Sequence, residues 1–202
     1  FLVWPGLAAY VKLLLPGPNS ILANLANSLI ISGGAALATL VLGSLAAYAF
    51  SRYRFPGWRP LLLLMLATRL LPPITAVIPL FLLMSRMGLV DTHWVLILIY
   101  TALDLPFATW LMKAFFDAVP RELEEAAAID GSSGLGTLWR ITLPLATSGL
   151  AATAIFVFVL AWNEFMFAFI FTSVRARTMP VLIAQTLGEY QIFWQDMSSL
   201  AT

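Results

Sequence analysis

The sequence has no cysteine, a single histidine (His93) and few charged residues. The missing thiols exclude disulfide frameworks and cysteine chemistry. One histidine leaves almost no material for a His-based metal site or a Ser-His triad, so we expect neither a bound metal nor a catalytic centre. Charged residues make up 10% of the chain, whereas about 25% is usual in soluble domains. The formal net charge of +1 predicts no nucleic-acid partner.

What the sequence has instead is long apolar runs, with 61% hydrophobic residues among 202. Because lipid cannot satisfy an exposed backbone, such runs cross a membrane as α-helices. Each run reaches the length of about 20 residues that a bilayer core requires. The sequence therefore predicts an all-α membrane protein with four spans, at residues 27–50, 60–84, 94–116 and 145–172.

Glycines and prolines modify these spans. Gly33, Gly34 and Gly43 in the first span permit close helix–helix contact in lipid, as in ordinary bundle packing. The second span contains Pro72, Pro73 and Pro79 in its interior, and the third contains Pro106. Because proline removes a helical hydrogen bond, we expect kinked or broken helices in both spans.

The distribution of Lys and Arg predicts the orientation. Residues 51–59 and 113–142 carry six of them, whereas residues 1–26, 85–93 and 173–202 carry four. Since cytoplasmic loops are enriched in Lys and Arg, the loop 117–144 is predicted to be cytoplasmic, and segments 1–26 and 173–202 extracytoplasmic. The first residue is Phe1, and we expect a truncated chain without its first and last spans.

Two charged residues lie inside predicted spans. Arg69 follows Arg59 by ten residues and Asp104 precedes Lys113 by nine, which places both side chains ~13–15 Å deep at 1.5 Å per residue. We predict that they form an intramembrane ion pair that holds the bundle together. Direct contact with a substrate is the alternative reading, because intramembrane charges commonly mark functional sites.

Polar and aromatic residues near the outer end of the fourth span suggest a substrate pathway. Asn163 and Glu164 lie beside Trp162, a combination that suits sugar hydroxyls and ring faces. Interfacial anchoring by the aromatic ring explains the same pattern. Thr68 and Thr75, near the prolines of the second span, are further candidates for the pathway lining.

The stretch "EEAAAIDGSSGLGTLWRITLPL" (124–145) is unusually polar for this chain. Pro120 suits the first turn of a helix, and Arg121 lies within side-chain reach of Glu124 and Glu125. Asp130-Gly131 is a helix stop, since glycine adopts the left-handed cap conformation. The pattern predicts two short amphipathic helices joined by a sharp turn. They form either a docking surface for a partner or a solvated loop resting on the membrane.

This stretch resembles the EAA loop of inner-membrane permeases in binding-protein-dependent ABC importers. "EEAAAIDG" is followed by Pro144 within "RITLPLA", and "NSLI", "AAYAFSRYRFPG", "IPLFLLMSRMGLVDT" and "AWNEF" resemble the carbohydrate-uptake, maltose-type branch in the same order. The resemblance covers residues 27–172. It implies a loop that docks into a cytoplasmic ATPase, and carries that role to Glu125, Ala126, Ala127, Asp130, Gly131, Leu143 and Pro144.

The resemblance also implies a function. The chain would be a non-catalytic permease subunit of an ATP-driven importer for a sugar or related polyol in the cytoplasmic (inner) membrane. Its partners would be a second permease, two ATPase subunits that bind ATP and Mg, and an extracytoplasmic binding protein. Segment 173–202 is either a contact for that binding protein or an ordinary loop.

Two alternatives remain open from the residues. One is an ion-gradient-driven transporter, in which Asp104 serves as the coupling carboxylate; the other is an ABC permease for a non-carbohydrate solute. An intramembrane enzyme lacks the necessary cluster of reactive side chains. The sequence does not identify the substrate.

Overall fold

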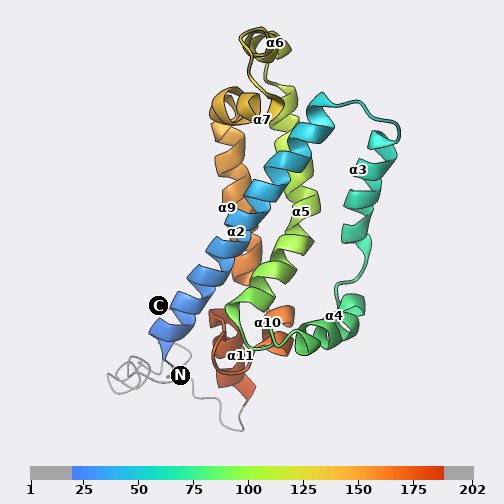
Figure 1. Cartoon of the computed structure of the whole chain (residues 1–202). Helices are drawn as coiled ribbons and strands as arrows, with labels where there is room; N and C mark the ends of the chain where they lie inside the picture. The colour runs from blue at the N-terminus through green and yellow to red at the C-terminus, as the bar shows by residue number, and fades with distance from the viewer. Residues whose placement is uncertain (1–19, 189–202) are drawn as a thin grey trace, which may run out of the picture. The chain divides into compact units, whose positions relative to one another are not determined.

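The computed structural model describes residues 20–188, and all regular structure in this range is helical (Figure 1). The helices are α2 (Ile21–Arg52), α3 (Trp58–Ala67), the 3₁₀ turn η1 (Thr68–Leu70), α4 (Ile74–Arg86), α5 (His93–Asp117), α6 (Arg121–Ile129), α7 (Gly134–Thr137), the π-helical turn η2 (Leu138–Thr142), α8 (Leu143–Leu145), α9 (Thr147–Asn163), α10 (Met166–Phe171) and α11 (Met179–Gly188).

Two helices of this part of the chain, α2 and α5, are long and apolar enough to cross a membrane unaided. Two bent pairs, α3 to α4 and α7 to α9, raise that number to four if each pair is one span. The first span begins earlier than expected, because α2 starts at Ile21 within the segment that we predicted to lie outside the membrane core. Residues 1–19 and 189–202, which hold the rest of the two predicted outer segments, lie outside the described residues.

The second span is broken, as its prolines predict. α3 and η1 end at Leu70, and Leu71 is extended (φ −70°, ψ 131°), the conformation favoured before a proline. α5, in contrast, runs through Pro106 without interruption, so the third span is not broken there, and a kink at Pro106 stays a prediction. The fourth span is divided between α9 and α10, which leaves Glu164 and Phe165 in the gap.

The described residues form two compact units. The first contains residues 20–34, Ala76–Leu98 and 160–188, and the second contains Ala35–Thr75 and Ile99–Val159. The core of the second unit joins α2, α5, η2 and the start of α9; its buried members are Ala47, Tyr48, Met112, Phe116, Val119, Leu138 and Ala146. These side chains lie at the ends of α2 and α5, next to the predicted coupling loop.

Close helix packing in the second unit depends on Gly149 of α9. A Cβ atom at this position would lie 2.1 Å from Cγ of Phe115 on α5, far inside van der Waals contact. Gly43 is less demanding, because its Cβ would meet Met112 Sδ at an ordinary 3.5 Å. Gly149, which the sequence did not single out, is therefore a position in this unit where close helix packing requires glycine.

In the first unit, Asp91 and Asn27 fix the segment that follows α10. Asp91 adopts the left-handed conformation (φ 59°), and its carboxylate accepts hydrogen bonds from the backbone N–H groups of Ser173 through Ala176. The amide of Asn27 donates to the carbonyl oxygens of Arg175 and Arg177, at 2.9 Å each. Part of the predicted outer segment is thus held against the N-terminal end of α2.

Candidate functional site

The polar loop folds as predicted into two short helical segments. Pro120, however, lies before the first turn of α6 in an extended conformation (φ −58°, ψ 132°) and occupies the N-cap position. Gly131 is left-handed (φ 84°). The N–H of Ser132 donates to Ala127 O (2.9 Å) and that of Gly131 to Ala128 O (3.1 Å). These two hydrogen bonds form a Schellman motif, which ends α6 sharply.

The second segment begins at Ser133, whose side chain accepts a hydrogen bond from Gly136 N (3.2 Å). It continues through the π-helical turn η2, which leads to Pro144. π turns redirect side chains within a helix and are frequent at functional sites. Residues Gly134–Leu145 then meet α9 at a bend of 83°.

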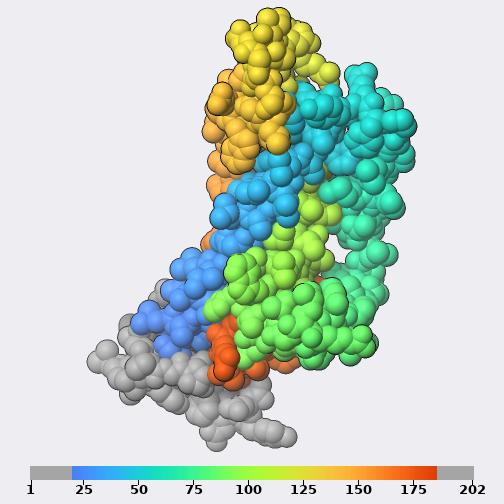
Figure 2. All heavy atoms as spheres, viewed as in Figure 1, coloured from blue at the N-terminus to red at the C-terminus, as the bar shows by residue number. Residues whose placement is uncertain are grey.

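One face of α6 is open to solvent and the other is covered. Among the residues predicted to dock on the ATPase, Glu125, Ala126, Asp130 and Gly131 are exposed, and Ala127 is half-buried. Ile129 is 88% exposed. The atoms of α6 (yellow in Figure 2) stand at the surface of their unit. Leu143 is partly buried and Pro144 is exposed in the exit turn.

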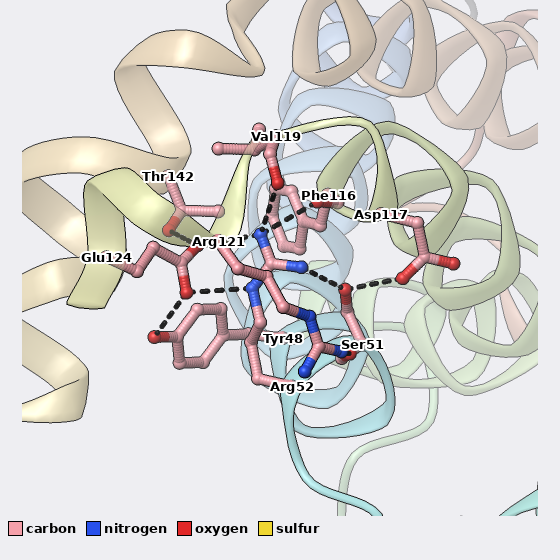
Figure 3. A network of polar contacts seen from close by, with 9 residues as sticks. All are labelled: Tyr48, Ser51, Arg52, Phe116, Asp117, Val119, Arg121, Glu124 and Thr142. Carbon is pink, nitrogen blue, oxygen red and sulfur yellow. Dashed lines mark hydrogen bonds and ion pairs between the residues drawn. The ribbon is translucent and has the colours of Figure 1, made fainter.

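The covered face of α6 is held by Glu124. Its carboxylate accepts two hydrogen bonds from the guanidinium of Arg52, from Nε and Nη2, both at 2.7 Å (Figure 3). Thr142 in η2 donates its hydroxyl to the same carboxylate at 2.7 Å, and Tyr48 donates at 3.4 Å. The side chains of Arg52 and Glu124 are only 8% and 10% exposed.

Arg52 also caps the end of α5. Its Nη2 donates to the carbonyl oxygens of Phe116 (2.9 Å) and Val119 (3.2 Å), and its Nη1 donates to Ser51 Oγ (3.0 Å). Cationic side chains at a helix C-terminus satisfy its unpaired carbonyls and complement its dipole. One guanidinium thus joins the C-terminal ends of α2 and α5 to α6.

Two further contacts complete this network (Figure 3). Ser51 Oγ donates to Asp117 Oδ1 at 2.6 Å, and Arg121 Nη2 donates to the carbonyl oxygen of Ser51 at 3.0 Å. Arg121 therefore binds the end of α2 and not Glu124 or Glu125, the glutamates that helical spacing puts within its reach. The end of α2 offers it a backbone acceptor, and Glu124 is already bound by Arg52.

The electrostatics of Glu124 follow from these contacts. Burial removes water from the carboxylate and by itself raises its pKa. The hydrogen bonds from Arg52 and Thr142, together with the positive charge of Arg52, more than offset burial and hold the pKa of Glu124 below its ordinary value. The carboxylate is thus ionised at neutral pH.

The structure brings Arg69 and Asp104 together as an ion pair within the second unit. Asp104 lies near the middle of the 25-residue α5, and its side chain is 8% exposed. Arg69 Nε also donates to Leu103 O (3.2 Å), and its guanidinium lies over the ring of Phe107. Arg69 remains 34% exposed, so the pair sits at the edge of this unit.

The predicted pathway residues have local partners. Glu164 accepts hydrogen bonds from the N–H groups of Phe167 and Ala168 and so caps α10. The hydroxyls of Thr68 and Thr75 donate to the backbone oxygens of Met65 (2.6 Å) and Pro72 (2.8 Å) at the break in the second span. Asn163 is exposed and Trp162 half-buried. The structure gives Glu164 a structural role as a helix cap and leaves a substrate role for these residues as a prediction.

Sequence reasoning missed Arg52, Tyr48 and Thr142. Arg52 and Tyr48 lie within "AAYAFSRYRFPG", a stretch that carried the resemblance but was given no role, and Thr142 lies within the polar stretch 124–145 but was given none either. The signal that could have found the pair is the position of Glu124 on the inward side of a short helix, where a half-buried carboxylate needs a cation beside it.

Comparison with known proteins identifies the family of this chain. The family described as "Binding-protein-dependent transport system inner membrane component" matches residues 18–202. The chain belongs to this family. As a permease of this family it is an integral membrane protein, and its relatives are non-catalytic membrane subunits of ABC transporters.

Individual relatives are similar over most of the permease. It is 41% identical to the trehalose/maltose transport system permease protein MalG of Thermococcus litoralis over 187 residues, which cover 92% of this chain and 67% of the relative. It is 36% identical to the sulfoquinovosyl glycerol transport system permease protein SmoH of Agrobacterium fabrum, over 96% of this chain and 68% of the relative. The crystal structure of a bacterial ABC transporter that imports the polysaccharide alginate has the same fold (TM-score 0.75, 24% identity, 96% and 67% coverage).

Proposed function

We propose that this permease is one transmembrane subunit of an ATP-driven importer that moves a sugar or related polyol across the cytoplasmic membrane. The observation that carries the proposal is α6, a short helix with one exposed face and one face tied by buried hydrogen bonds to the ends of two long apolar helices. Such an element can take up motion from a soluble partner and pass it into the membrane helices. The proposed partner is a pair of ATPase subunits, which bind ATP and Mg.

The other partners follow from the same proposal. A second permease would complete the pathway, and an extracytoplasmic binding protein would deliver the substrate. The substrate class is supported by the relatives, which include permeases for trehalose or maltose and for sulfoquinovosyl glycerol. The protein would be a multi-pass protein of the inner membrane. An ion-gradient mechanism finds no support in α5, because Asp104 is engaged by Arg69 rather than open to a coupling ion.

Cysteine crosslinking tests the docking of α6. The chain has no native cysteine, so a single thiol gives a clean signal. Ala126→Cys, on the exposed face, is expected to crosslink to the ATPase in inside-out vesicles, with a yield that changes when ATP is added. Ala146→Cys is the matched control, because the same residue type at a position outside the predicted docking residues is buried (4% exposed) and is expected not to crosslink.

Transport supplies the second arm of the test. The complete transporter in proteoliposomes is offered a panel of labelled trehalose, maltose and glycerol-linked sugars, with ATP enclosed on the ATPase side. ATP-dependent uptake of a panel member supports the proposal. Uptake that persists after the ATPase is removed, together with no crosslink from Ala126→Cys, would refute it.

A further inference from the structure

The buried pair Arg52–Glu124 is a feature that the exposed docking face of α6 does not explain. We infer that this pair is the positioning element that makes α6 and the C-terminal end of α2 move as one rigid body. The inference rests on the proposed function, in which α6 receives motion from an ATPase. It assigns the transmission of that motion to a residue that faces away from the docking surface.

The contacts of the pair converge from four elements. Glu124 belongs to α6 and binds Arg52 of α2 and Thr142 of η2. Arg52 in turn binds the carbonyl oxygens of Phe116 and Val119 at and just beyond the end of α5. The entrance to the coupling loop, its exit and the two long helices therefore meet at one ion pair (Figure 3).

The geometry of the pair fixes direction as well as distance. Two parallel N–H···O hydrogen bonds between a guanidinium and a carboxylate resist rotation, whereas a single contact permits it. The hydroxyl of Thr142 binds one of the same two oxygens from the other side of the loop. Rotation of α6 about its own axis would break these hydrogen bonds together.

Hydrophobic burial alone does not require this arrangement. Removing two charges from water carries a large desolvation cost, and an apolar pair of similar size often fills such a site equally well. Buried ionic groups are retained in some proteins because they specify one arrangement of the elements that they join. The arrangement around Arg52 fits this role, since Nε and Nη2 bind the two oxygens of Glu124 while Nη2 also reaches the end of α5 and Nη1 binds Ser51.

The three glutamates of α6 are thereby divided between two tasks. Glu122 and Glu125 are exposed, and Glu125 belongs to the residues expected to face the ATPase. Glu124 is turned inward and has no exposed surface to offer to a partner beyond 10% of its side chain. Loss of Glu124 is expected to leave docking intact and to impair transmission.

The experiment measures rigidity directly in the complete transporter. Spin labels are attached to Leu123→Cys on α6 and Arg54→Cys just beyond α2, both exposed positions in a chain without other cysteines. Pulsed electron paramagnetic resonance then records the distance between the labels, with and without ATP. The wild-type pair is expected to give one narrow distance distribution that ATP does not change.

Glu124→Gln is expected to broaden that distribution and to make it respond to ATP, while Ala126→Cys still crosslinks to the ATPase. Sugar moved per ATP hydrolysed, measured with the panel member that the wild type transports, is expected to fall about tenfold, within the range of ordinary coupling free energies. Glu122→Gln is the matched control, because it makes the same substitution on the exposed face of the same helix. It is expected to behave as wild type in all three measurements.

Each outcome decides whether the Arg52–Glu124 pair positions α6 or only stabilises the fold. A narrow, ATP-independent distance in Glu124→Gln would overturn the inference, as would a wild-type distance that changes with ATP. If Glu124→Gln fails to assemble, the apolar pair Arg52→Met with Glu124→Leu is measured instead, since it leaves no buried charge unpaired. A broad distribution in this double variant supports the inference; a narrow one, or failure to assemble again, refutes it. If Ala126→Cys gives no crosslink to the ATPase when Arg52 and Glu124 are both unchanged, the proposed function is refuted instead.

Discussion

Gly149→Ala tests whether α9 and α5 pack as closely as the structure shows. The new Cβ would lie 2.1 Å from Cγ and 2.6 Å from Cβ of Phe115, so the backbones must separate or Phe115 must leave its position. Overpacking of this kind costs about 1–3 kcal/mol, and a clash with atoms close to the backbone belongs at the upper end. The higher helix propensity of alanine returns about 1 kcal/mol.

The expected net loss is therefore about 2 kcal/mol, which lowers the midpoint of thermal unfolding by roughly 4–8 °C in a protein of this size. The measurement is thermal unfolding of the purified full-length permease in detergent. Gly33→Ala is the matched control, because no atom lies within 4 Å of its Cβ position, and it is expected to be neutral or stabilising. A Phe115→Ala change in the Gly149→Ala background is expected to recover part of the loss, as coupled neighbours do. If Gly149→Ala is as well tolerated as Gly33→Ala, the close approach of the two helices is wrong.

Three further predictions concern charges and one turn. Arg69→Met removes the cation that faces the buried carboxylate of Asp104 and is expected to destabilise the permease by about 3–5 kcal/mol, whereas adding Asp104→Leu restores most of the loss. Thermal unfolding of both variants checks this. Hydrogen bonds hold the pKa of Glu124 and of Asp91 below their ordinary values of 4.5 and 3.8, although burial opposes this. The stability that each carboxylate adds is therefore complete above its ordinary pKa and is lost as the pH falls below it. Thermal unfolding measured between pH 7 and pH 3 should show a smaller acid-induced loss of stability in Glu124→Gln and in Asp91→Asn than in wild type. Gly131→Ala places a side chain at φ 84° and is expected to destabilise the turn after α6 by about 1–2 kcal/mol. The measurement is the rate at which a protease cleaves this loop, which is expected to rise. An unchanged cleavage rate would count against the left-handed turn.

The sequence predicted correctly those features that depend on the local conformation of a few residues or on the depth of a charge in the membrane. The helix stop at Asp130-Gly131 depends only on the conformational freedom of glycine, and the structure has it. The pairing of Arg69 with Asp104 followed from equal depth on successive spans, since few partners are available to a charge in lipid. The broken second span followed from its prolines for the same local reason.

Long-range contacts explain what the sequence could not predict. Arg52 and Glu124 are 72 residues apart, while Arg121 offered Glu124 a nearer partner by helical spacing alone. The early start of α2 was missed because the predicted first span began at residue 27, and polar Asn24 lies before it. The polar side chains of Asn27 and Ser28 are bonded by the segment around residues 175–179. The role of Glu164 was missed because a cap for a six-residue helix leaves no periodic signal.

The hydrogen bonds of Asn27 and Ser28 have a consequence for biogenesis. They join residues that are 148 to 151 positions apart in the chain, and a ribosome adds about 5–20 residues per second. The N-terminal end of α2 must therefore wait about 8–30 s after its own synthesis before its polar partners leave the ribosome. During that interval its amide and hydroxyl groups need water or the insertion machinery to bind them. The contacts of this end of the helix are complete only when nearly all of the described chain has been made.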